Sequence, residues 1–300
     1  MSVDYSSPTP RARLAAVAAA LLCTASLAQA EAVVGLTSAN ALVMFDTATP
    51  LNASVPVTIT GLLGTNETIL GIDRRPANGV LYGLGSSGRL YTLNTATGAA
   101  TFASQISGAS LSGTAFGVDF NPVPDRLRVT SNAGQNLRID VTTGIAVVDA
   151  AINGQTTSLA GSAYTNNVAG AASTTLYGIS SATDSLYVQS PPNNGALVLV
   201  GVLGIDTVGV TGFDISGTSG LAFASLTNGD TAESSFYSIN LTTGTATLIG
   251  GFGIGGNPAL AAPLLGIALS VGVIPEPSGY AMMAAGLLAV ASIVRRRRQG

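Results

Sequence analysis

Branched apolar residues alternate with polar ones in short runs along most of the chain, a pattern typical of β-strands with one buried face. Between several runs lie turns that begin with Asn or Asp and end with Gly, at 94–98, 140–144 and 240–244. Asn and Asp side chains accept hydrogen bonds from turn N–H groups, and Gly adopts the positive φ that such turns need. The pattern therefore predicts an all-β chain of short strands.

The pattern of strands and turns repeats along the chain. Four similar segments begin at Leu70, Phe116, Tyr164 and Gly212. The residues that align in the first strand of each copy are Asp73, Asp119, Asn167 and Asp214, which are 46, 48 and 47 residues apart. Each copy holds four short strands, and four-stranded units with a period of roughly 40 to 50 residues are typical of β-propeller blades.

The two ends of the repeat region complete one further blade. The run that begins at Leu264 matches the first strand of a copy, with Ala268 at the Asp position. The runs from Val33 and Val55 match the second to fourth strands. We therefore expect residues 31–272 to form a β-propeller of five four-stranded blades, whose split blade closes the ring and protects its edges.

The N-terminal residues resemble a secretory signal peptide. Arg11 and Arg13 precede an apolar run over 14–27, and Ala28-Gln29-Ala30 follows it. A basic region, an apolar region and a small-x-small site predict a signal peptide over 1–30, cleaved before Glu31. The alternatives are a first transmembrane helix and a lipid anchor on Cys23. The apolar run is short and Ala-rich, and Leu22 stands where a lipoprotein site needs a small residue.

Composition limits the chemistry of the remaining chain. Residues 31–300 contain no Cys, His, Lys or Trp. This excludes a Ser-His-Asp triad, a thiol nucleophile, a lysine Schiff base and the usual zinc sites. Residues 31–274 hold six Arg and thirteen acids, a net charge of −7, which argues against nucleic acid as a partner. No cofactor is predicted, although oxygen ligands for calcium are present.

The repeated acids are one candidate site. In a propeller the first strands line a central channel, so Asp73, Asp119, Asn167 and Asp214 are expected at one level around it. This ring could hold calcium or a polar substrate. The alternative, which we favour because the residue recurs in several copies, is a structural role in which each side chain bonds the backbone of the next blade.

A cluster of arginines is the second candidate site. The second copy alone holds Arg126, Arg128 and Arg138, together with Asn136. Residues 126 and 128 alternate along one strand, so their side chains share a face. Guanidinium groups bind carboxylates, sulfates and phosphates through paired hydrogen bonds, so the cluster could bind an acidic ligand. The alternative, which we favour, is an internal lattice of ion pairs with Asp125 and Asp140.

The C-terminal segment 273–300 has three parts in order. Pro275-Glu276-Pro277 comes first, a mostly apolar stretch over 279–294 follows, and Arg295, Arg296, Arg297 and Arg298 come last. A helix of this length, about 24 Å, falls short of the roughly 30 Å hydrocarbon core, and the arginines favour the cytoplasmic side. The segment resembles the PEP-CTERM sorting signal of Gram-negative bacteria. This resemblance implies cleavage by an exosortase, in bacteria that make exopolysaccharide and live in biofilms.

The body of the chain also resembles a bacterial propeller-like family of unknown function. The shared segments are "LLGIDRRPANGVLYGLGSSGRLYTLNTATGAAT" and "FGVDFNPVPDRLRVTSNAGQNLRID". The resemblance implies a propeller fold and brings no activity with it.

Together these features predict an exported protein of the cell surface or extracellular matrix. We expect the Sec translocon, signal peptidase and an exosortase as its processing partners, a transient inner-membrane anchor, and extracellular polysaccharide as a ligand of a non-catalytic binding domain. The alternative is a propeller enzyme that acts on sugars or lactones through carboxylates at the channel mouth. Two carboxylates on the floor of an open cleft would favour the enzyme. Aspartates bonded to backbone would favour the binding domain.

Overall fold

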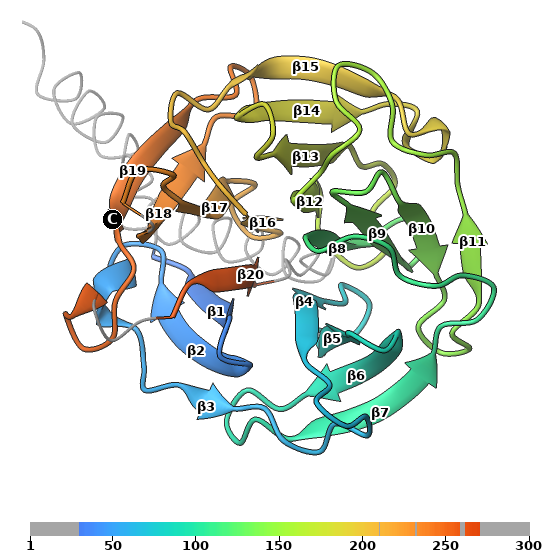
Figure 1. Ribbon diagram of the computed structural model, residues 1–300, viewed down its shortest axis with the longest axis horizontal. Coiled ribbons are helices and arrows are strands. Elements are labelled where there is room, and N and C mark those ends of the chain that lie inside the picture. The colour runs from blue at the N-terminus through green and yellow to red at the C-terminus, as the bar shows by residue number, and fades with distance from the viewer. Residues whose placement is uncertain (1–29, 210, 232, 259–261, 271–300) are drawn as a thin grey trace, which may run out of the picture. The chain divides into compact units, whose positions relative to one another are not determined.

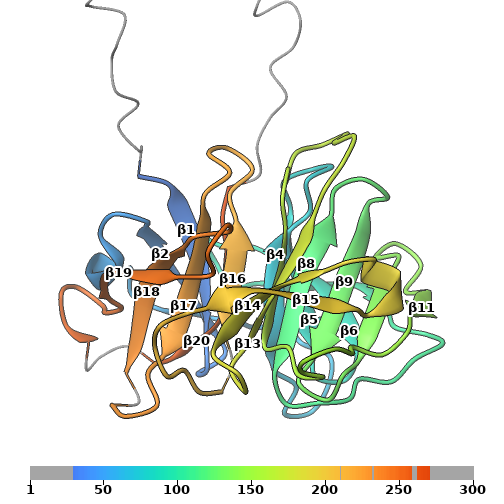
Figure 2. The ribbon, with the colours of Figure 1, turned by 90° about the horizontal axis from the view of Figure 1, so that it is seen from above.

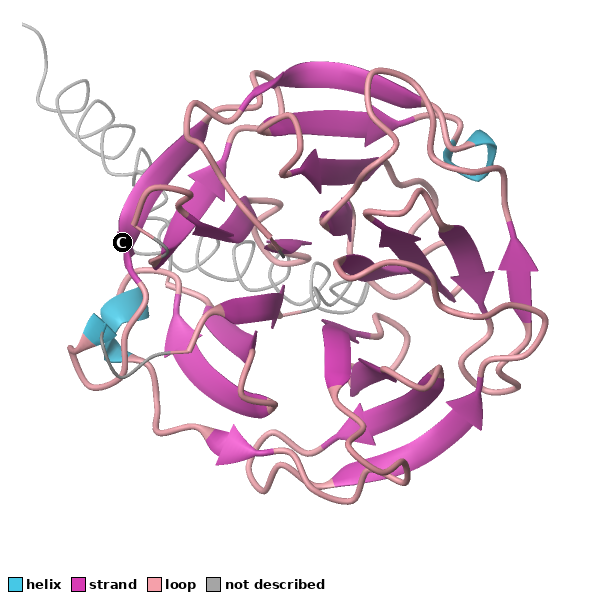
Figure 3. Cartoon of the chain, in the orientation of Figure 1, coloured by secondary structure: helices cyan, strands magenta, loops and turns pink. Residues whose placement is uncertain are grey.

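Alternating apolar runs form the strands of the computed structural model, which describes residues 30–209, 211–231, 233–258 and 262–270. Residues 1–29 of the predicted signal peptide and the whole predicted sorting signal, 273–300, lie outside the described residues. The chain divides after Ala30 into two units, and every described strand belongs to the second. Figure 3 shows that strands dominate this unit.

The described residues form twenty strands and two short 3₁₀ helices. In chain order they are β1 (Ala32–Thr37), β2 (Ala41–Asp46), η1 (Pro50–Asn52), β3 (Val57–Thr58), β4 (Ile69–Arg74), β5 (Leu81–Gly85), β6 (Arg89–Leu93), β7 (Ala100–Gln105), β8 (Phe116–Asn121), β9 (Arg126–Ser131), β10 (Asn136–Ile139), β11 (Ala146–Val148), β12 (Gly161–Tyr164), β13 (Leu176–Ser180), β14 (Ser185–Gln189), η2 (Pro192–Asn194), β15 (Leu197–Val202), β16 (Gly212–Ile215), β17 (Ala222–Thr227), β18 (Ser234–Ile239), β19 (Ala246–Gly251) and β20 (Leu264–Ala268). None of the helices in this described part is long and apolar enough to cross a membrane.

The strands make five four-stranded antiparallel sheets, as the repeat predicts. We call them blade 1 (β4–β7), blade 2 (β8–β11), blade 3 (β12–β15), blade 4 (β16–β19) and the closing blade (β20-β1-β2-β3). Figure 1 shows the five sheets arranged around a central channel, with the first strand of each sheet innermost. Figure 2 shows the same blades from the side. The five-bladed propeller is therefore confirmed.

The closing blade joins the two ends of the repeat region. Strand β20 pairs antiparallel with β1, with Val34 opposite Ala268 and Gly35 opposite Ile267. Strand β1 pairs with β2, and β2 pairs with β3. The innermost strand of this blade thus comes from the C-terminal part, and the other three come from the N-terminal part. The predicted split blade is confirmed.

The apolar core lies between the blades as a series of layers. One layer joins Tyr82 and Leu84 of blade 1 to Phe116 and Phe120 of blade 2. Corresponding layers join blade 3 to blade 4, blade 4 to the closing blade, and the closing blade to blade 1. Four of the five blade boundaries therefore hold such a layer, and between blades 2 and 3 there is only a small cluster that packs the β11–β12 connection against blade 3. Each repeat depends on its neighbours to bury its apolar faces.

A glycine lies two positions before the Asp position in every inner strand. These glycines are Gly71, Gly117, Gly161, Gly212 and Gly266. A Cβ atom on Gly117 would lie 2.5 Å from Ser162 Oγ and 2.6 Å from Ser162 N. At Gly117 the neighbouring inner strand is therefore too close for a side chain, whereas at Gly266 the nearest atoms would lie 3.5 Å from an added Cβ, which is an ordinary contact.

Candidate functional site

Three carboxylates meet at one level of the inner strands. Asp73 on β4, Asp119 on β8 and Asp214 on β16 are each about 1% exposed. An oxygen atom from each of the three residues lies within 4.8 Å of the others. The corresponding positions of blade 3 and the closing blade hold Ala163 and Ala268. Each lies two residues after the glycine of its inner strand. We call these three carboxylates the aspartate cluster.

The aspartate cluster bonds the backbone across blade boundaries. Asp73 Oδ2 accepts a hydrogen bond of 2.7 Å from Phe120 N of blade 2. Asp119 Oδ1 accepts one of 3.1 Å from Tyr164 N of blade 3. Asp214 Oδ2 accepts one of 2.6 Å from Leu269 N, just after β20. Each aspartate therefore ties its own inner strand to the next, as the structural interpretation of the repeat requires.

The remaining oxygens of the aspartate cluster differ in their surroundings. Asp73 Oδ1 and Asp214 Oδ1 each accept a hydrogen bond of 2.6 Å from the next N–H along the chain, of Arg74 and Ile215. Asp119 Oδ2 is buried and has no hydrogen-bond partner among the described residues. Such an unpaired buried oxygen is costly, because its interaction with water is lost and nothing replaces it.

Burial and mutual repulsion disfavour the ionised form of these side chains. Burial, and then the charge of Asp214, raise the pKa of Asp73 well above its ordinary value. Burial, and then the charges of Asp73 and Asp214, do the same to the pKa of Asp119. Burial raises the pKa of Asp214 to about 7, against the opposing hydrogen bonds from Leu269 and Ile215. Three ionised carboxylates at this distance require a positive partner.

Asn167 does not occupy the ring position that the sequence alignment predicts for it. Strand β12 ends at Tyr164, so Asn167 lies in the following loop, and Ala163 takes the ring position in blade 3. The loop from 165 to 175 is longer than its counterparts, and this displaced the alignment by four residues. The Asn167 side chain is nevertheless fully buried, and neither its oxygen nor its nitrogen has a partner within the described part of the chain.

An open groove without charged side chains lies between two loops of blades 3 and 4. It has a volume of about 520 Å³ and lies between the β12–β13 loop and the β16–β17 loop. Its lining includes Asn166, Ser173, Ser216, Thr218 and Ser219, with several Gly and Ala residues and no charged side chain. We call it the loop groove. Sequence analysis missed it, because its lining residues come from two loops 43 to 54 positions apart and are mostly small, without a charged side chain.

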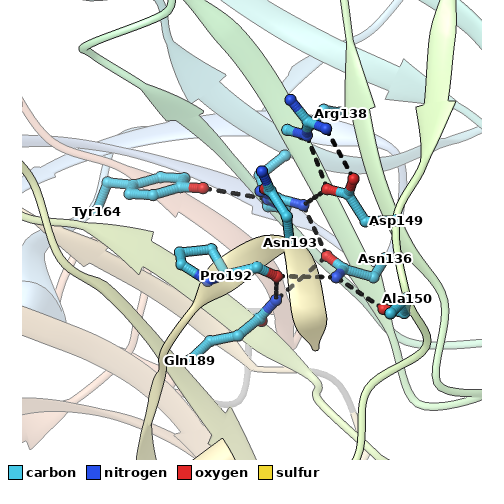
Figure 4. A network of polar contacts seen from close by, with 9 residues as sticks. Asn136, Arg138, Asp149, Ala150, Tyr164, Gln189, Pro192 and Asn193 are labelled. Carbon is cyan, nitrogen blue, oxygen red and sulfur yellow. Dashed lines mark hydrogen bonds and ion pairs between the residues drawn. The ribbon is translucent and has the colours of Figure 1, made fainter. Parts of the chain in front are cut away.

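The arginine cluster is internal. Arg128 is about 1% exposed and bridges blade 2 and blade 3. It donates hydrogen bonds to Tyr164 Oη at 3.1 Å and to Asn193 Oδ1 at 2.9 Å, both in blade 3. It also donates to Asn136 Oδ1 at 2.8 Å and to Asp149 Oδ2 at 2.6 Å. Figure 4 shows these side chains converging between the two blades.

Two other members of the predicted cluster, Arg138 and Asn136, form hydrogen bonds near the same boundary between blades 2 and 3. Arg138 forms two hydrogen bonds with Asp149, of 2.7 and 2.8 Å. The Asn136 amide donates to Ala150 O and Pro192 O, both at 3.0 Å. Arg126 is separate from them: its side chain is 42% exposed and pairs with Asp140 at 3.2 Å. Arg128, Arg138 and Asn136 therefore belong to one lattice with Asp149, and Arg126 lies apart from it.

The lattice of ion pairs was expected, but two of its partners were not. Asp125 pairs with Arg75 of blade 1 instead of an arginine of its own blade. Asp149, which the sequence analysis did not single out, binds both Arg128 and Arg138. Burial alone would raise the pKa of Asp149, but hydrogen bonds and charge from the two arginines hold that pKa below its ordinary value. An isolated Asp directly after a strand does not show in the sequence which arginines will pair with it.

Residues 41–262 match the family described as a domain of unknown function, DUF4394. The chain belongs to this family. The match covers all five blades except strands β1 and β20 of the closing blade. Membership in DUF4394 confirms the resemblance to a propeller-like family without an assigned activity. No curated protein matches the chain.

Several solved structures are similar to this DUF4394 protein at low sequence identity. One is a structural genomics protein of unknown function from Bacteroides thetaiotaomicron, with 13% identity and a TM-score of 0.44. The likeness covers 74% of this chain and 58% of that one, so the chain spans little more than half of that relative. Another is named as a candidate 6-phosphogluconolactonase from Bacteroides fragilis, with 14% identity, a TM-score of 0.37 and coverage of 79% and 69%. No activity is carried over from either protein.

Proposed function

We propose that this DUF4394 protein is an exported, non-catalytic binding domain of the cell surface or extracellular matrix, with its ligand site in the loop groove. One observation carries the proposal. The carboxylates that an enzyme would need are buried and hydrogen-bonded to the backbone of neighbouring blades. A general acid or base must reach the substrate, and these groups are instead part of the ring.

The lining of the loop groove indicates the ligand class. Its polar groups are serine and threonine hydroxyls, one Asn side chain and the backbone of small residues. An uncharged surface with many hydroxyl and amide groups suits a ligand that both donates and accepts hydrogen bonds. A neutral, hydroxyl-rich polymer such as an extracellular polysaccharide meets this description. An acidic polymer is less suitable, because Arg128 is buried and its hydrogen bonds are used internally.

The sequence features at both ends support the location that we propose. A signal peptide over 1–30 would export the chain, and the Pro275-Glu276-Pro277 segment with Arg295 to Arg298 would deliver it to an exosortase. Exosortase substrates occur in bacteria that secrete polysaccharide. A surface protein that binds such a polymer would fit this setting.

A glycan array that includes neutral and acidic polysaccharides tests the ligand class. We expect the protein to bind neutral glycans, with little dependence on salt, because no charged side chain lines the loop groove. The variant Thr218→Trp places a large side chain in the groove and should weaken binding at least tenfold. The matched control is Thr242→Trp, on the exposed β18–β19 turn of the same blade, which should bind as the wild type does.

Other outcomes would contradict the proposal in different ways. Release of sugar fragments during incubation would favour the enzyme alternative. Binding confined to acidic glycans and abolished by salt would favour an anion site. Loss of binding in both tryptophan variants would mean that the groove is not the binding surface.

A further inference from the structure

The aspartate cluster has a feature that its role in joining blades does not explain. Two of its members, Asp73 and Asp214, use both carboxylate oxygens in backbone hydrogen bonds. The third, Asp119, uses only one, and its Oδ2 is buried without a partner in the described structure. This oxygen belongs to a side chain that points into the cluster, since all three residues contribute an oxygen within 4.8 Å of the others.

The hydrogen bonds around the cluster come from backbone N–H groups, which do not cancel its charge. No arginine forms an ion pair with these carboxylates among the described residues. The charge of Arg74 lowers the pKa values of Asp73 and Asp214, but burial raises them more, and the Arg74 guanidinium donates to Gly79 O at 3.2 Å. Glu31 adds a further negative charge near Asp214. A bound cation would offset the repulsion between the three carboxylates, and it would also give the unpaired Asp119 Oδ2 a partner.

We propose that Asp73, Asp119 and Asp214 bind one calcium ion in the central channel, with Asp119 Oδ2 as a ligand. Hard divalent cations take oxygen ligands, and three carboxylates can supply three to six of them. Residues 31–300 contain neither His nor Cys, so the site offers none of the ligands that zinc or copper prefer. The site does not depend on the loop groove, so its test and that of the proposed function are separate.

The burial of the donor set favours calcium over magnesium, because all three aspartates are about 1% exposed. Magnesium keeps several of its waters when it binds to protein, whereas calcium accepts a site made mostly of protein oxygens.

Calcium at this position would stabilise the contacts between the inner strands of the propeller. The three aspartates reach blades 2 and 3 and the end of β20 through their hydrogen bonds. An ion held by all three would therefore oppose separation of the inner strands. Because the unfolded chain lacks the site, binding would stabilise the folded state by mass action.

Thermal unfolding of the full-length protein tests the proposal. After dialysis against a chelator, the protein is titrated with calcium chloride to about 5 mM, with magnesium chloride and sodium chloride at matched ionic strength as controls. We expect calcium alone to raise Tm by about 5 °C or more. The shift should be larger at pH 8 than at pH 5, because protons compete with the metal for the carboxylates. Elemental analysis of the dialysed, calcium-loaded protein should find one calcium per chain.

The variant Asp119→Asn distinguishes a metal site from a merely structural carboxylate. It keeps an oxygen that can accept from Tyr164 N, but it removes one negative charge from the cluster. In chelator the variant should melt at or above the wild type, because repulsion is relieved. In calcium it should melt below the wild type and show no calcium shift. The matched control Asp230→Asn removes an exposed acid from the β17–β18 loop and should respond as the wild type does.

Two results would overturn the proposal. One is wild-type protein that retains no calcium and has the same Tm in calcium and in chelator. The other is an Asp119→Asn variant with the same calcium content and shift as the wild type. If that variant does not fold, the calcium content and Tm shift of the wild type still decide the question.

Discussion

Arg128 shows how much of a single residue's environment could be predicted. Alternation along β9 predicts that it shares a face with Arg126, and the acids nearby in sequence suggest internal ion pairs. Its main partner, Asp149, could not be found this way, because the contact depends on how the chain returns after β11. The positions opposite the ring residue in blades 1, 3 and 4 hold Tyr82, Tyr177 and Phe223. Arg128 is thus a polar exception in a repeated apolar position.

Replacing Arg128 with alanine should strongly destabilise the fold. The change removes the donor to Tyr164 Oη, Asn136 Oδ1 and Asn193 Oδ1, and leaves Asp149 with Arg138 alone. Breaking one side of a buried ion pair typically costs about 3–5 kcal/mol. We expect a value near the lower end, since Arg138 remains. The free energy of unfolding in urea measures it.

The matched control for this prediction is Arg126→Ala on the same strand. Its side chain is 42% exposed and makes one ion pair with Asp140. Exposed pairs of this kind contribute roughly 0–1 kcal/mol. Equal, small losses in both variants would contradict the internal role of Arg128, and unchanged stability with lost binding to an acidic polymer would favour an anion site there.

At the scale of elements, periodicity predicted the blades well where the loops keep their lengths. In blades 1 and 2 the loop after the inner strand is short, over 75–80 and 122–125, and Asp73 and Asp119 both fall on the inner strands as aligned. In blade 3 the longer β12–β13 loop moved the alignment, so Asn167 was placed in the ring instead of Ala163. Sequence similarity alone does not show where an inserted loop begins. Hydrogen bonding between β12 and β13 does.

The closing blade allows a test of the element that completes the ring. A chain that ends at Pro263 lacks β20 and so exposes the edge of β1. It also loses Leu264, Ile267 and Leu269, which are each at most 2% exposed. Burial of each such side chain contributes roughly 1.5–3 kcal/mol, and 1 kcal/mol corresponds to about 2–4 °C in a domain of this size. We expect Tm to fall by at least about 10 °C.

A chain that ends at Ile274 is the control for this truncation. It keeps β20 and should melt as the full-length protein does, while light scattering should detect aggregation only in the chain that ends at Pro263. If the two shortened chains have the same Tm and the same size in solution, pairing of β20 with β1 contributes nothing to the ring.

At the scale of the whole molecule, the ring is complete before the predicted sorting signal begins. Leu269 N donates to Asp214 Oδ2, and Ser270 O accepts a hydrogen bond of 3.3 Å from Gly217 N. These are the last described contacts along the chain. Removal of everything after about Pro277 would therefore take no residue from the five blades. This separation supports our proposal that an exosortase processes the protein after export.

Processing gives a prediction that does not depend on the ligand. Protein isolated from its native host should begin at Glu31 and lack the residues after about Pro277, because cleavage at both signals leaves the ring intact. Intact-mass and peptide mass spectrometry measure both ends. Glu276→Ala should leave the C-terminal arginines attached, whereas Glu233→Ala, a matched change on the exposed β17–β18 loop, should not affect cleavage. Wild-type peptides that extend through Arg298 in the mature protein would contradict the exosortase assignment.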